Sequence, residues 1–308
     1  MSTPKLSIII CTFNRQRFLK GLFSSIVAQN LKPELFETVL INNNSTDDTE
    51  YLCKEFIDAN PQLRIKYFVE RQLGLSFARN RGIAESSGEY LTFADDDAIM
   101  APDFCYQICR YLDANADVGE VGGPARLKFL CDVPRWHNKW LASLFGYFMP
   151  SSKEYKMRRK GSNYPRGLNM SFRREAFDRC GGFDVNLGRM GRILLGGEEK
   201  DIAFRIIDSG LKVAYSPDIL VHHLVPKERT EVDFIRKQAL GTGLSERIRS
   251  QGQNKYFSRI CIELFKWGAT LALWVLYMLS LRPSAANMLV RFRFWVSKGL
   301  FFSKSLPV

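Results

Sequence analysis

Paired cysteines are absent from this chain, and histidine is scarce. The 308 residues include seven cysteines, an odd number at scattered positions without a Cys-x-x-Cys pair, and only three histidines. Zinc sites and disulfide frameworks repeat these residues at short spacings, so the pattern favours buried, reduced thiols. The opening segment, Met1 to Lys5, leads straight into a strand-like run without the apolar stretch of a signal peptide. We therefore expect a protein of the reducing cytoplasm.

Excess charge is also absent from most of the chain. The net charge is +12, but residues 227–308 hold 14 basic and 5 acidic residues, which leaves the other 226 residues close to neutral. The composition, 46% hydrophobic and 25% charged, is that of an ordinary globular protein with room for one large domain or two small ones. A basic end of this kind indicates either nucleic acid or an anionic membrane surface, and the neighbouring residues have to discriminate between them.

Apolar strands alternate with helical patterns through the first 120 residues. Residues 6–11 and 37–41 are near-continuous apolar runs, as in strands buried on both faces, and each is followed by apolar residues at helical spacing. Further strands are expected at 64–69 and 90–94, and the regularity loosens after Gly119. Such alternation predicts right-handed strand–helix–strand units and a mainly parallel sheet, whose ligands bind at the carboxyl ends of the strands.

Three consecutive carboxylates, Asp95, Asp96 and Asp97, directly follow the apolar run 90–94. Adjacent like charges repel, and folding gives no reason for them at the mouth of a buried strand. A Mg²⁺ or Mn²⁺ ion would relieve the repulsion, because these cations take oxygen ligands from one or two carboxylates and complete their shell with substrate phosphates. Asp is also a common turn residue, so the triplet by itself fits a turn as well as a metal site. Its place at the ligand-binding edge of the predicted sheet favours the metal.

Six motifs in a fixed order make the chain similar to a known family. They are SIIICTFNR (7–15), NNNSTDD (42–48), ARNRGI (78–83), FADDD (93–97), GLNMSFR (167–173) and GEEKDI (197–202). On these motifs, residues 5–230 resemble the family 2 glycosyltransferases. The resemblance implies an α/β protein of the GT-A fold, with a mixed, mainly parallel sheet flanked by helices, and here with a C-terminal helical extension.

The resemblance also implies roles on the donor side. The aspartate triplet matches the family's DxD motif, so Asp97 is expected to bind the metal, Asp96 to contact ribose or metal, and Asp95 to line the donor site. The nucleoside pocket and the region of the donor phosphates are expected to include Thr12, Asn14, Arg15, Asn43 and Arg79. Asn43 stands where the family often has an Asp that reads a uracil N–H. Its carbonyl oxygen can still accept that hydrogen bond, which favours a UDP-sugar.

On the acceptor side, residues 197–202 resemble the family's Glu-Asp motif at the start of a helix. Glu199 occupies the position of the base that deprotonates the acceptor hydroxyl, and Glu198 and Asp201 are the alternatives. Acidic residues also favour any helix N-terminus, which would explain them without catalysis.

Two further sites follow from the resemblance. His223, favoured over His222 by its spacing, is expected near the metal or the donor phosphates, and a satisfied core histidine is the alternative. Asn169 and Arg173 are expected to face the acceptor, with a structural turn role as the alternative for Asn169.

The C-terminal quarter combines apolar helices with cations. Residues 267–281 carry no charge, and a helix of that length spans about 22 Å, short of the roughly 30 Å hydrocarbon core. Residues 288–296 are rich in aromatics, and one helical stripe collects Ser284, Asn287, Arg291 and Lys298. Cations beside Trp- and Phe-rich helices predict insertion into the interface of an anionic membrane leaflet. A buried core, a homodimer interface and a spanning helix are the alternatives, and nucleic acid is disfavoured because aliphatic runs interrupt the basic residues.

The sequence thus predicts a metal-dependent inverting glycosyltransferase. Its GT-A domain would cover residues 1–230, with a donor half at 1–120 and an acceptor half at 121–230, and residues 231–308 would associate with the membrane. The basic loop 153–160 and the basic tail indicate a lipid-linked or surface-glycan acceptor at the inner face of the cell membrane. A sugar-phosphate nucleotidyltransferase would carry a Gly-rich phosphate loop after the first strand, which residues 12–15 are not. A non-catalytic membrane adaptor would have no use for the intact aspartates.

Overall fold

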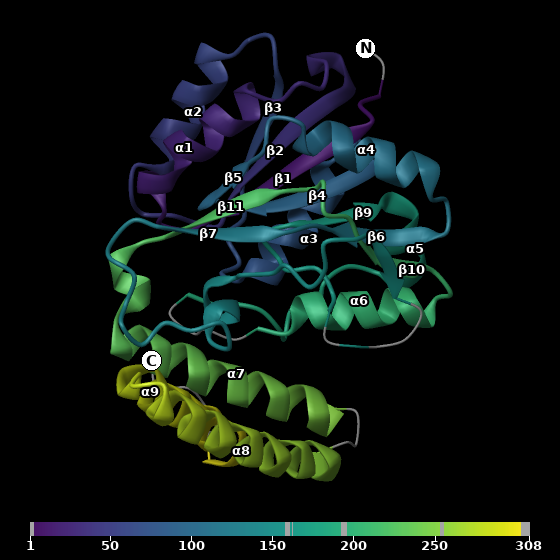
Figure 1. Cartoon of the computed structure of the whole chain (residues 1–308). Helices are drawn as coiled ribbons and strands as arrows, with labels where there is room; N and C mark the ends of the chain where they lie inside the picture. The colour runs from purple at the N-terminus through teal and green to yellow at the C-terminus, as the bar shows by residue number, and fades with distance from the viewer. Residues whose placement is uncertain (1–2, 158–160, 162, 192–195, 253–255, 303–308) are drawn as a thin grey trace. The chain divides into compact units, whose positions relative to one another are not determined.

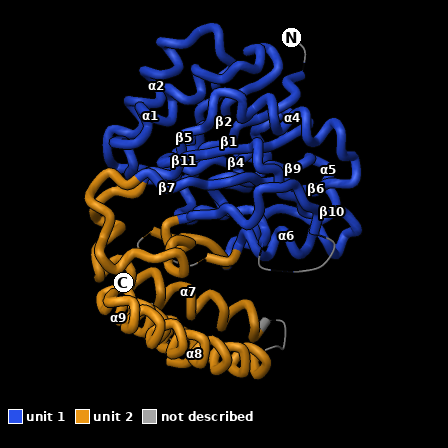
Figure 2. The backbone as a smooth tube through the Cα atoms, in the orientation of Figure 1, with its two compact units in different colours: residues 1–128, 146–186, 198–224 blue, residues 129–145, 187–197, 225–308 orange. Residues whose placement is uncertain are grey.

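The computed structural model of the chain describes residues 3–157, 161, 163–191, 196–252 and 256–302 (Figure 1). The chain divides into two compact units (Figure 2). Unit 1 holds residues 1–128, 146–186 and 198–224, and unit 2 holds residues 129–145, 187–197 and 225–308. Unit 2 therefore includes two segments from the middle of the sequence besides the predicted C-terminal region.

Unit 1 is built on an eight-stranded sheet in the order β3-β2-β1-β4-β9-β6-β10-β8. The four strands expected in the first 120 residues are confirmed, and they run parallel to one another: β1 (Leu6–Thr12), β2 (Phe36–Asn42), β3 (Arg64–Val69) and β4 (Tyr90–Asp95). β9 (Met170–Arg173) pairs antiparallel with both β4 and β6 (Val118–Gly122). β10 (Lys212–Tyr215) runs parallel to β6, and β8 (Tyr155–Met157) closes the sheet antiparallel to β10. The fold class is the predicted one, α/β with a mixed, mainly parallel sheet.

A second sheet of three strands has the order β5-β11-β7. Its strands are β5 (Ala98–Met100), β11 (Val221–Val225) and β7 (Ala125–Phe129). β5 begins directly after the aspartate triplet, and its Ala98 lies opposite His223 in the antiparallel pair with β11. This pairing brings a histidine from late in the sequence to the carboxyl end of β4.

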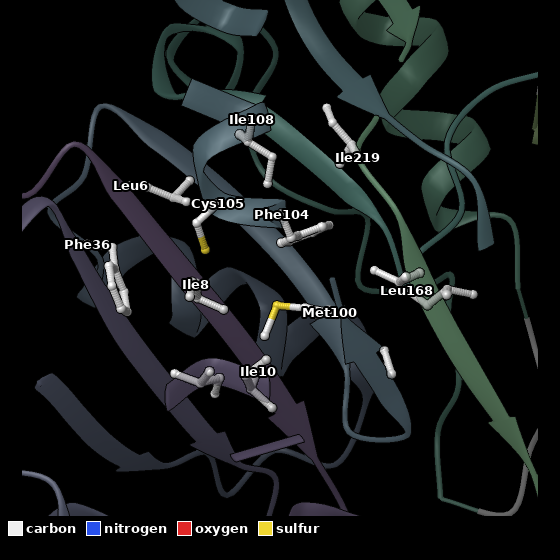
Figure 3. Close-up of a cluster of buried hydrophobic side chains, with 14 of the residues drawn as sticks. Leu6, Ile8, Ile10, Phe36, Met100, Phe104, Cys105, Ile108, Leu168 and Ile219 are labelled. Atoms are coloured by element: carbon white, nitrogen blue, oxygen red, sulfur yellow. The ribbon is translucent and has the colours of Figure 1, made fainter. Parts of the chain in front are cut away.

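Helices cover both faces of the large sheet, as the continuous apolar strands require. One apolar core joins Ile8 and Ile10 of β1 to α1 (Gln16–Val27), α2 (Thr49–Ala59) and α4 (Phe104–Ala114), and Figure 3 shows part of it. The other core joins Ile9 to α3 (Leu75–Glu85), α5 (Arg174–Cys180) and α6 (Glu198–Asp208). Successive residues of a strand point to opposite faces, which is why neighbouring isoleucines fill different cores. A short 3₁₀ turn, η1 (Pro33–Leu35), precedes β2.

Unit 2 consists mainly of three long helices, α7 (Val232–Gly252), α8 (Tyr256–Leu279) and α9 (Pro283–Phe302), with the short turns η2 (Ala142–Phe145) and η3 (Lys227–Thr230). α7 and α9 pack backbone to backbone at two glycines. A Cβ atom on Gly243 would lie 2.1 Å from the Val296 carbonyl oxygen, and one on Gly299 would lie 2.2 Å from that of Leu240. Of the described helices, one, α8, is long and apolar enough to cross a membrane.

Candidate active site

The aspartate triplet lies at the carboxyl edge of the parallel strands. Asp95 is the last residue of β4, next to Cys11 of β1, and Asp96 and Asp97 form the turn that leads into β5. Both turn residues are buried, Asp97 to 1% exposure. The Thr12 hydroxyl at the end of β1 donates a hydrogen bond to Asp96 Oδ2 at 2.9 Å.

Two buried carboxylates at one turn impose an electrostatic cost. Burial, and then the charge of Asp97, raises the pKa of Asp96 to about 7, against the opposing effect of Arg15. The Arg15 guanidinium lies 3.8 Å from Asp97 Oδ2, so one cation partly offsets the pair. A divalent ion would offset it more fully, because Mg²⁺ and Mn²⁺ favour carboxylate oxygens.

His223 completes this side of the site. Its Nε2 lies 2.9 Å from Asp97 Oδ1, and the neighbouring Leu224 amide donates to the Asp97 carbonyl oxygen. Carboxylate oxygens suit Mg²⁺ and Mn²⁺, which need only one or two of them beside phosphate oxygens, and the His223 imidazole lies next to Asp97 as a further potential ligand. Within the described ranges, no three or more His, Cys, Asp and Glu side chains form a metal-binding group. His222, its neighbour on β11, is half-buried, and burial followed by Arg126 and Lys128 lowers its pKa.

Arg79 of α3 joins the triplet to the acidic start of α6. Its Nη1 donates to Glu198 Oε1 at 2.9 Å, and its Nη2 lies 3.9 Å from Asp95 Oδ1. Burial lowers the pKa of Arg79, but Glu198, Glu199 and Asp95 more than compensate, so its pKa is raised and the side chain stays charged. The predicted donor and acceptor motifs therefore meet around one buried guanidinium.

Glu198 and Glu199 open α6 and differ in surroundings. Glu198 is 3% exposed, and its Oε2 has no hydrogen-bond partner in the described part of the chain. Burial, followed by the charge of Glu199, raises the pKa of Glu198 to about 7, although Arg79 acts against this. Glu199 is half-buried, and its Oε1 accepts a hydrogen bond from the Gly167 amide at 3.2 Å. Asp201, one turn on, is held by Arg205 at 2.8 Å.

Gly167 is a site residue that sequence reasoning did not assign. A Cβ atom here would lie 2.4 Å from Arg79 Nη2 and 2.7 Å from Glu199 Oε1, so a larger residue would push the two side chains away. The signal was its position as the first residue of the GLNMSFR motif. The absence of a Cβ atom lets the ends of both side chains approach the backbone at this residue.

Two predicted nucleoside-pocket residues tie loops together at the same edge. Asn43 is buried; its amide donates to the carbonyl oxygens of Glu70 and Gln72, and its Oδ1 accepts from the Gly74 amide at 2.8 Å. The oxygen expected to read a uracil is thus engaged by the backbone. Asn14 Oδ1 similarly accepts from the Thr46 amide at 2.7 Å.

The two predicted acceptor residues have structural contacts. The buried Asn169 amide donates to the carbonyl oxygens of Ile219 at 2.7 Å and Pro124 at 3.2 Å, which joins two loops. Arg173 pairs with Tyr90 at the start of β4, at the opposite end of that strand from Asp95, and donates to the Leu112 carbonyl oxygen at 2.7 Å. The structure does not bring Arg173 to the other site residues.

Glu120 is a second residue that the sequence reasoning missed. It lies on β6 beside Phe172 and Val213, which belong to the core under α6. It is fully buried, and neither carboxylate oxygen has a hydrogen-bond partner among the described residues. Burial, followed by the charge of Glu199, raises its pKa well above the ordinary value. A lone Glu between the apolar residues of a strand was the available signal.

Glu120→Gln should remove a pH dependence from the stability of the fold. The pKa of Glu120 is higher in the folded protein than in the unfolded chain, so above about pH 4.5 the folded state keeps a proton that the unfolded state loses. As the pH increases towards the raised pKa, the free energy of unfolding of the wild type falls by up to about 1.4 kcal/mol per pH unit. Relative to wild type, the melting temperature of the variant should therefore rise as the pH increases from about 5 towards the raised pKa. A difference in melting temperature that stays constant over this range would contradict a protonated Glu120.

The chain is similar to known proteins over most of its length. The family described as "Glycosyl transferase family 2" matches residues 7–181. A glucosyl-dolichyl phosphate glucuronosyltransferase of Haloferax volcanii is 26% identical over 247 residues, 79% of this chain and 77% of that protein. Among solved structures, the mannosyltransferase PcManGT from Pyrobaculum calidifontis, in complex with GDP-Man and Mn²⁺, matches with a TM-score of 0.65 at 18% identity, over 99% of this chain and 89% of that one. S. aureus TarS in complex with UDP matches with a TM-score of 0.53 at 17% identity, over 82% and 72%.

Proposed function

The chain belongs to glycosyl transferase family 2 and is a glycosyltransferase of the GT-A fold, and from this premise we propose a specific reaction. It transfers a sugar, with inversion and with the help of Mn²⁺ or Mg²⁺, from a nucleotide diphosphate to a lipid-linked or surface-glycan acceptor. The main support for the proposal is the position of the Arg79 side chain. One buried guanidinium between Asp95 and Glu198 gathers the donor-side and acceptor-side acidic groups into a single cluster.

Asp97, Asp96 and His223 are the residues that would hold the metal. When bound, the ion stabilises the negative charge that develops on the leaving nucleotide diphosphate. Thr12 orients Asp96 through its hydroxyl, and the proximity of Arg15 to Asp97 adds positive charge on the same side. These contacts keep both carboxylates in place before the donor arrives, so less ordering is needed on binding.

Glu199 is the base in this proposal. Its carboxylate takes the proton of the acceptor hydroxyl while the hydroxyl oxygen attacks the anomeric carbon, and the bond to the diphosphate oxygen breaks with its electron pair on the phosphate. Attack from the face opposite the leaving group inverts the configuration. The Gly167 amide orients Glu199, which is more accessible than the buried Glu198. Glu198 is held by Arg79 and Asp201 by Arg205, so both alternatives have an ionic partner already.

A lipid-linked acceptor at an anionic membrane surface is the second part of the proposal. The relative from Haloferax volcanii is named for a glucosyl-dolichyl phosphate substrate. The net positive charge of residues 227–308 and the long apolar helix α8 support attachment to the inner face of the membrane. Within the predicted basic loop 153–160, residues 158–160 lie outside the described chain.

A nucleotide-release screen tests the reaction. Uridine and guanosine diphosphate sugars are offered with Mn²⁺ or Mg²⁺ and again with chelator, because Asn43 has its carbonyl oxygen engaged and the two matched structures hold different nucleotides. We expect metal-dependent release of a nucleoside diphosphate from one donor, with a UDP-sugar favoured. Pyrophosphate released from a nucleoside triphosphate and a sugar phosphate would instead indicate a nucleotidyltransferase. If no donor showed metal-dependent turnover or protection, the chain would instead be a non-catalytic membrane adaptor.

A further inference from the structure

The outward face of α8 is apolar, whereas its inward face is polar. The exposed residues include Phe257, Leu264, Phe265, Leu271, Leu276 and Leu279, with Phe265 exposed to 79%. The buried residues of α8 are Arg259, Glu263 and Thr270, and Glu263 is 0% exposed. A helix on an aqueous surface buries its apolar stripe and exposes its charges. The opposite arrangement is stable where the surroundings of the helix are themselves apolar.

Contacts within α8 and with α9 hold the buried Glu263. Glu263 accepts hydrogen bonds from Arg259 at 3.1 Å, from Arg293 at 3.2 Å and from the Ser297 hydroxyl at 2.9 Å. Trp267 Nε1 donates to the same Ser297 hydroxyl at 2.9 Å. These bonds fix the rotation of α8 against α9, because a buried charge that loses its partners is strongly destabilising. The apolar residues are therefore held on the outside.

The segment 129–145 of the same unit presents similar residues beside the turn between α8 and α9. Arg282 Nη2 at that turn donates to the His137 carbonyl oxygen at 3.1 Å, which ties the segment to the helices. Its exposed apolar residues are Leu130, Val133 and Trp140. Lys139 Nζ lies 5.2 Å from the centre of the Trp140 ring. Trp with an adjacent cation is typical of side chains at the level of lipid headgroups.

We propose that α8 lies in the plane of an anionic lipid leaflet with its outward face in the boundary between headgroups and acyl chains. Leu130, Val133 and Trp140 enter the same leaflet. We call the six exposed α8 residues named above, together with these three, the lipid face. The inference rests on the membrane association proposed above and identifies the surface responsible for it.

Charges on α9 favour an in-plane helix over a spanning one. Tyr256 near the start of α8 contacts Leu300 and Trp274 near its end contacts Asn287, so α9 is an antiparallel partner along α8. If α8 crossed the bilayer, Arg291, Arg293 and Lys298 of α9 would be drawn towards the hydrocarbon, at a cost of a few kcal/mol each. In the plane of the leaflet, the exposed Arg291 and Lys298 can remain at the level of the headgroups.

Charge also favours lipid over a second copy of the chain. Exposed cations of this unit include Lys139, Arg282, Arg291 and Lys298. Two copies packed through the lipid face would bring their positive charges close together, and these would repel. Anionic headgroups would attract the same charges. The partner of the lipid face is therefore a leaflet that contains acidic phospholipid.

Vesicle binding by the full-length protein tests the proposal. Vesicles of phosphatidylcholine, with and without phosphatidylglycerol, are mixed with wild type, with Phe265→Ser/Leu276→Ser and with Val133→Ser/Trp140→Ser. Tyr51→Ser, at an exposed aromatic of α2 in unit 1, is the matched control. Each double variant should bind the mixed vesicles at least about tenfold more weakly than wild type, because two apolar side chains that would enter the leaflet are lost. The control should bind as wild type does.

Three results would overturn the proposal. The double variants could bind vesicles as tightly as wild type, or the protein could resist alkaline extraction from the vesicles as a spanning helix does. The same variants could also convert a dimer to a monomer, measured by light scattering, without any vesicle binding by wild type. Nucleotide release from a soluble donor, followed in parallel, reports on the proposed reaction alone. Release without vesicle binding contradicts the lipid face, and vesicle binding without release contradicts the reaction and leaves the lipid face supported.

Discussion

Glu199→Gln should lower kcat by about 10²- to 10⁴-fold, the range that loss of a general base produces. Gln keeps the oxygen that accepts from the Gly167 amide, so the first turn of α6 should remain folded. The donor should bind with unchanged affinity, since the proposed metal ligands lie on β11 and the turn after β4. A fall in kcat without a change in donor affinity is the signature of an interaction used only in the transition state. Single-turnover sugar transfer and donor titration measure the two quantities separately.

The neighbouring carboxylates provide the controls for this result. Asp201→Asn removes a carboxylate that Arg205 already holds, and it should keep most of the turnover. Glu198→Gln replaces the ion pair with Arg79 by a weaker hydrogen bond, so it should loosen the cluster and affect donor affinity as well. Turnover retained in Glu199→Gln but lost in Glu198→Gln would identify Glu198 as the base.

The parts of the fold set by local apolar pattern could be predicted from the sequence. β1, β2 and β4 extend the predicted runs by one or two residues, because strands buried on both faces are continuous apolar runs. β3 also has the predicted bounds, although it is half-buried and carries Arg64 and Lys66. The pairing of β9 between β4 and β6 and the pairing of β11 with β5 depend on residues far apart in the chain. No local pattern specifies such pairings.

The types of the residues predicted some members of the candidate site. The positions of other residues depend on contacts between distant parts of the chain, which the sequence does not show. Asp97 and His223, both predicted as metal ligands, lie within hydrogen-bonding distance of each other. Arg173 instead lies at the other end of β4 from Asp95, because β9 runs antiparallel to β4 and places the end of its motif there. In the tail, a count of cations overstates the charge presented to a membrane, since Arg259 and Arg293 are paired with Glu263. The inverted polarity of α8 is visible only after α8 and α9 are packed together.

Asp97→Ala should abolish the metal-dependent part of donor binding. In the proposed site the ion would lose a direct ligand in this variant, and loss of even an outer-shell partner usually weakens metal binding by about 10- to 100-fold. We therefore expect a loss of at least about 100-fold in affinity for the nucleotide diphosphate with Mn²⁺, and no change in the weak binding that remains with chelator. Isothermal titration with and without metal measures both. At about 100 times its Kd a ligand stabilises the fold by about 2.7 kcal/mol, so the wild-type melting temperature should rise with Mn²⁺ and nucleotide while that of the variant should not.

The variant should fold, which keeps this result interpretable. Asp97 is buried beside Asp96, and the charge of Asp97 helps to raise the pKa of that neighbour to about 7. Removal of Asp97 therefore relieves a repulsion, although His223 and Arg15 each lose a contact. Asp95→Asn, at the member of the triplet nearest Arg79, should lose less affinity for the metal complex than Asp97→Ala. Equal losses in the two variants would mean that the triplet acts through its total charge, whereas a larger loss at Asp97 identifies this carboxylate as the principal ligand.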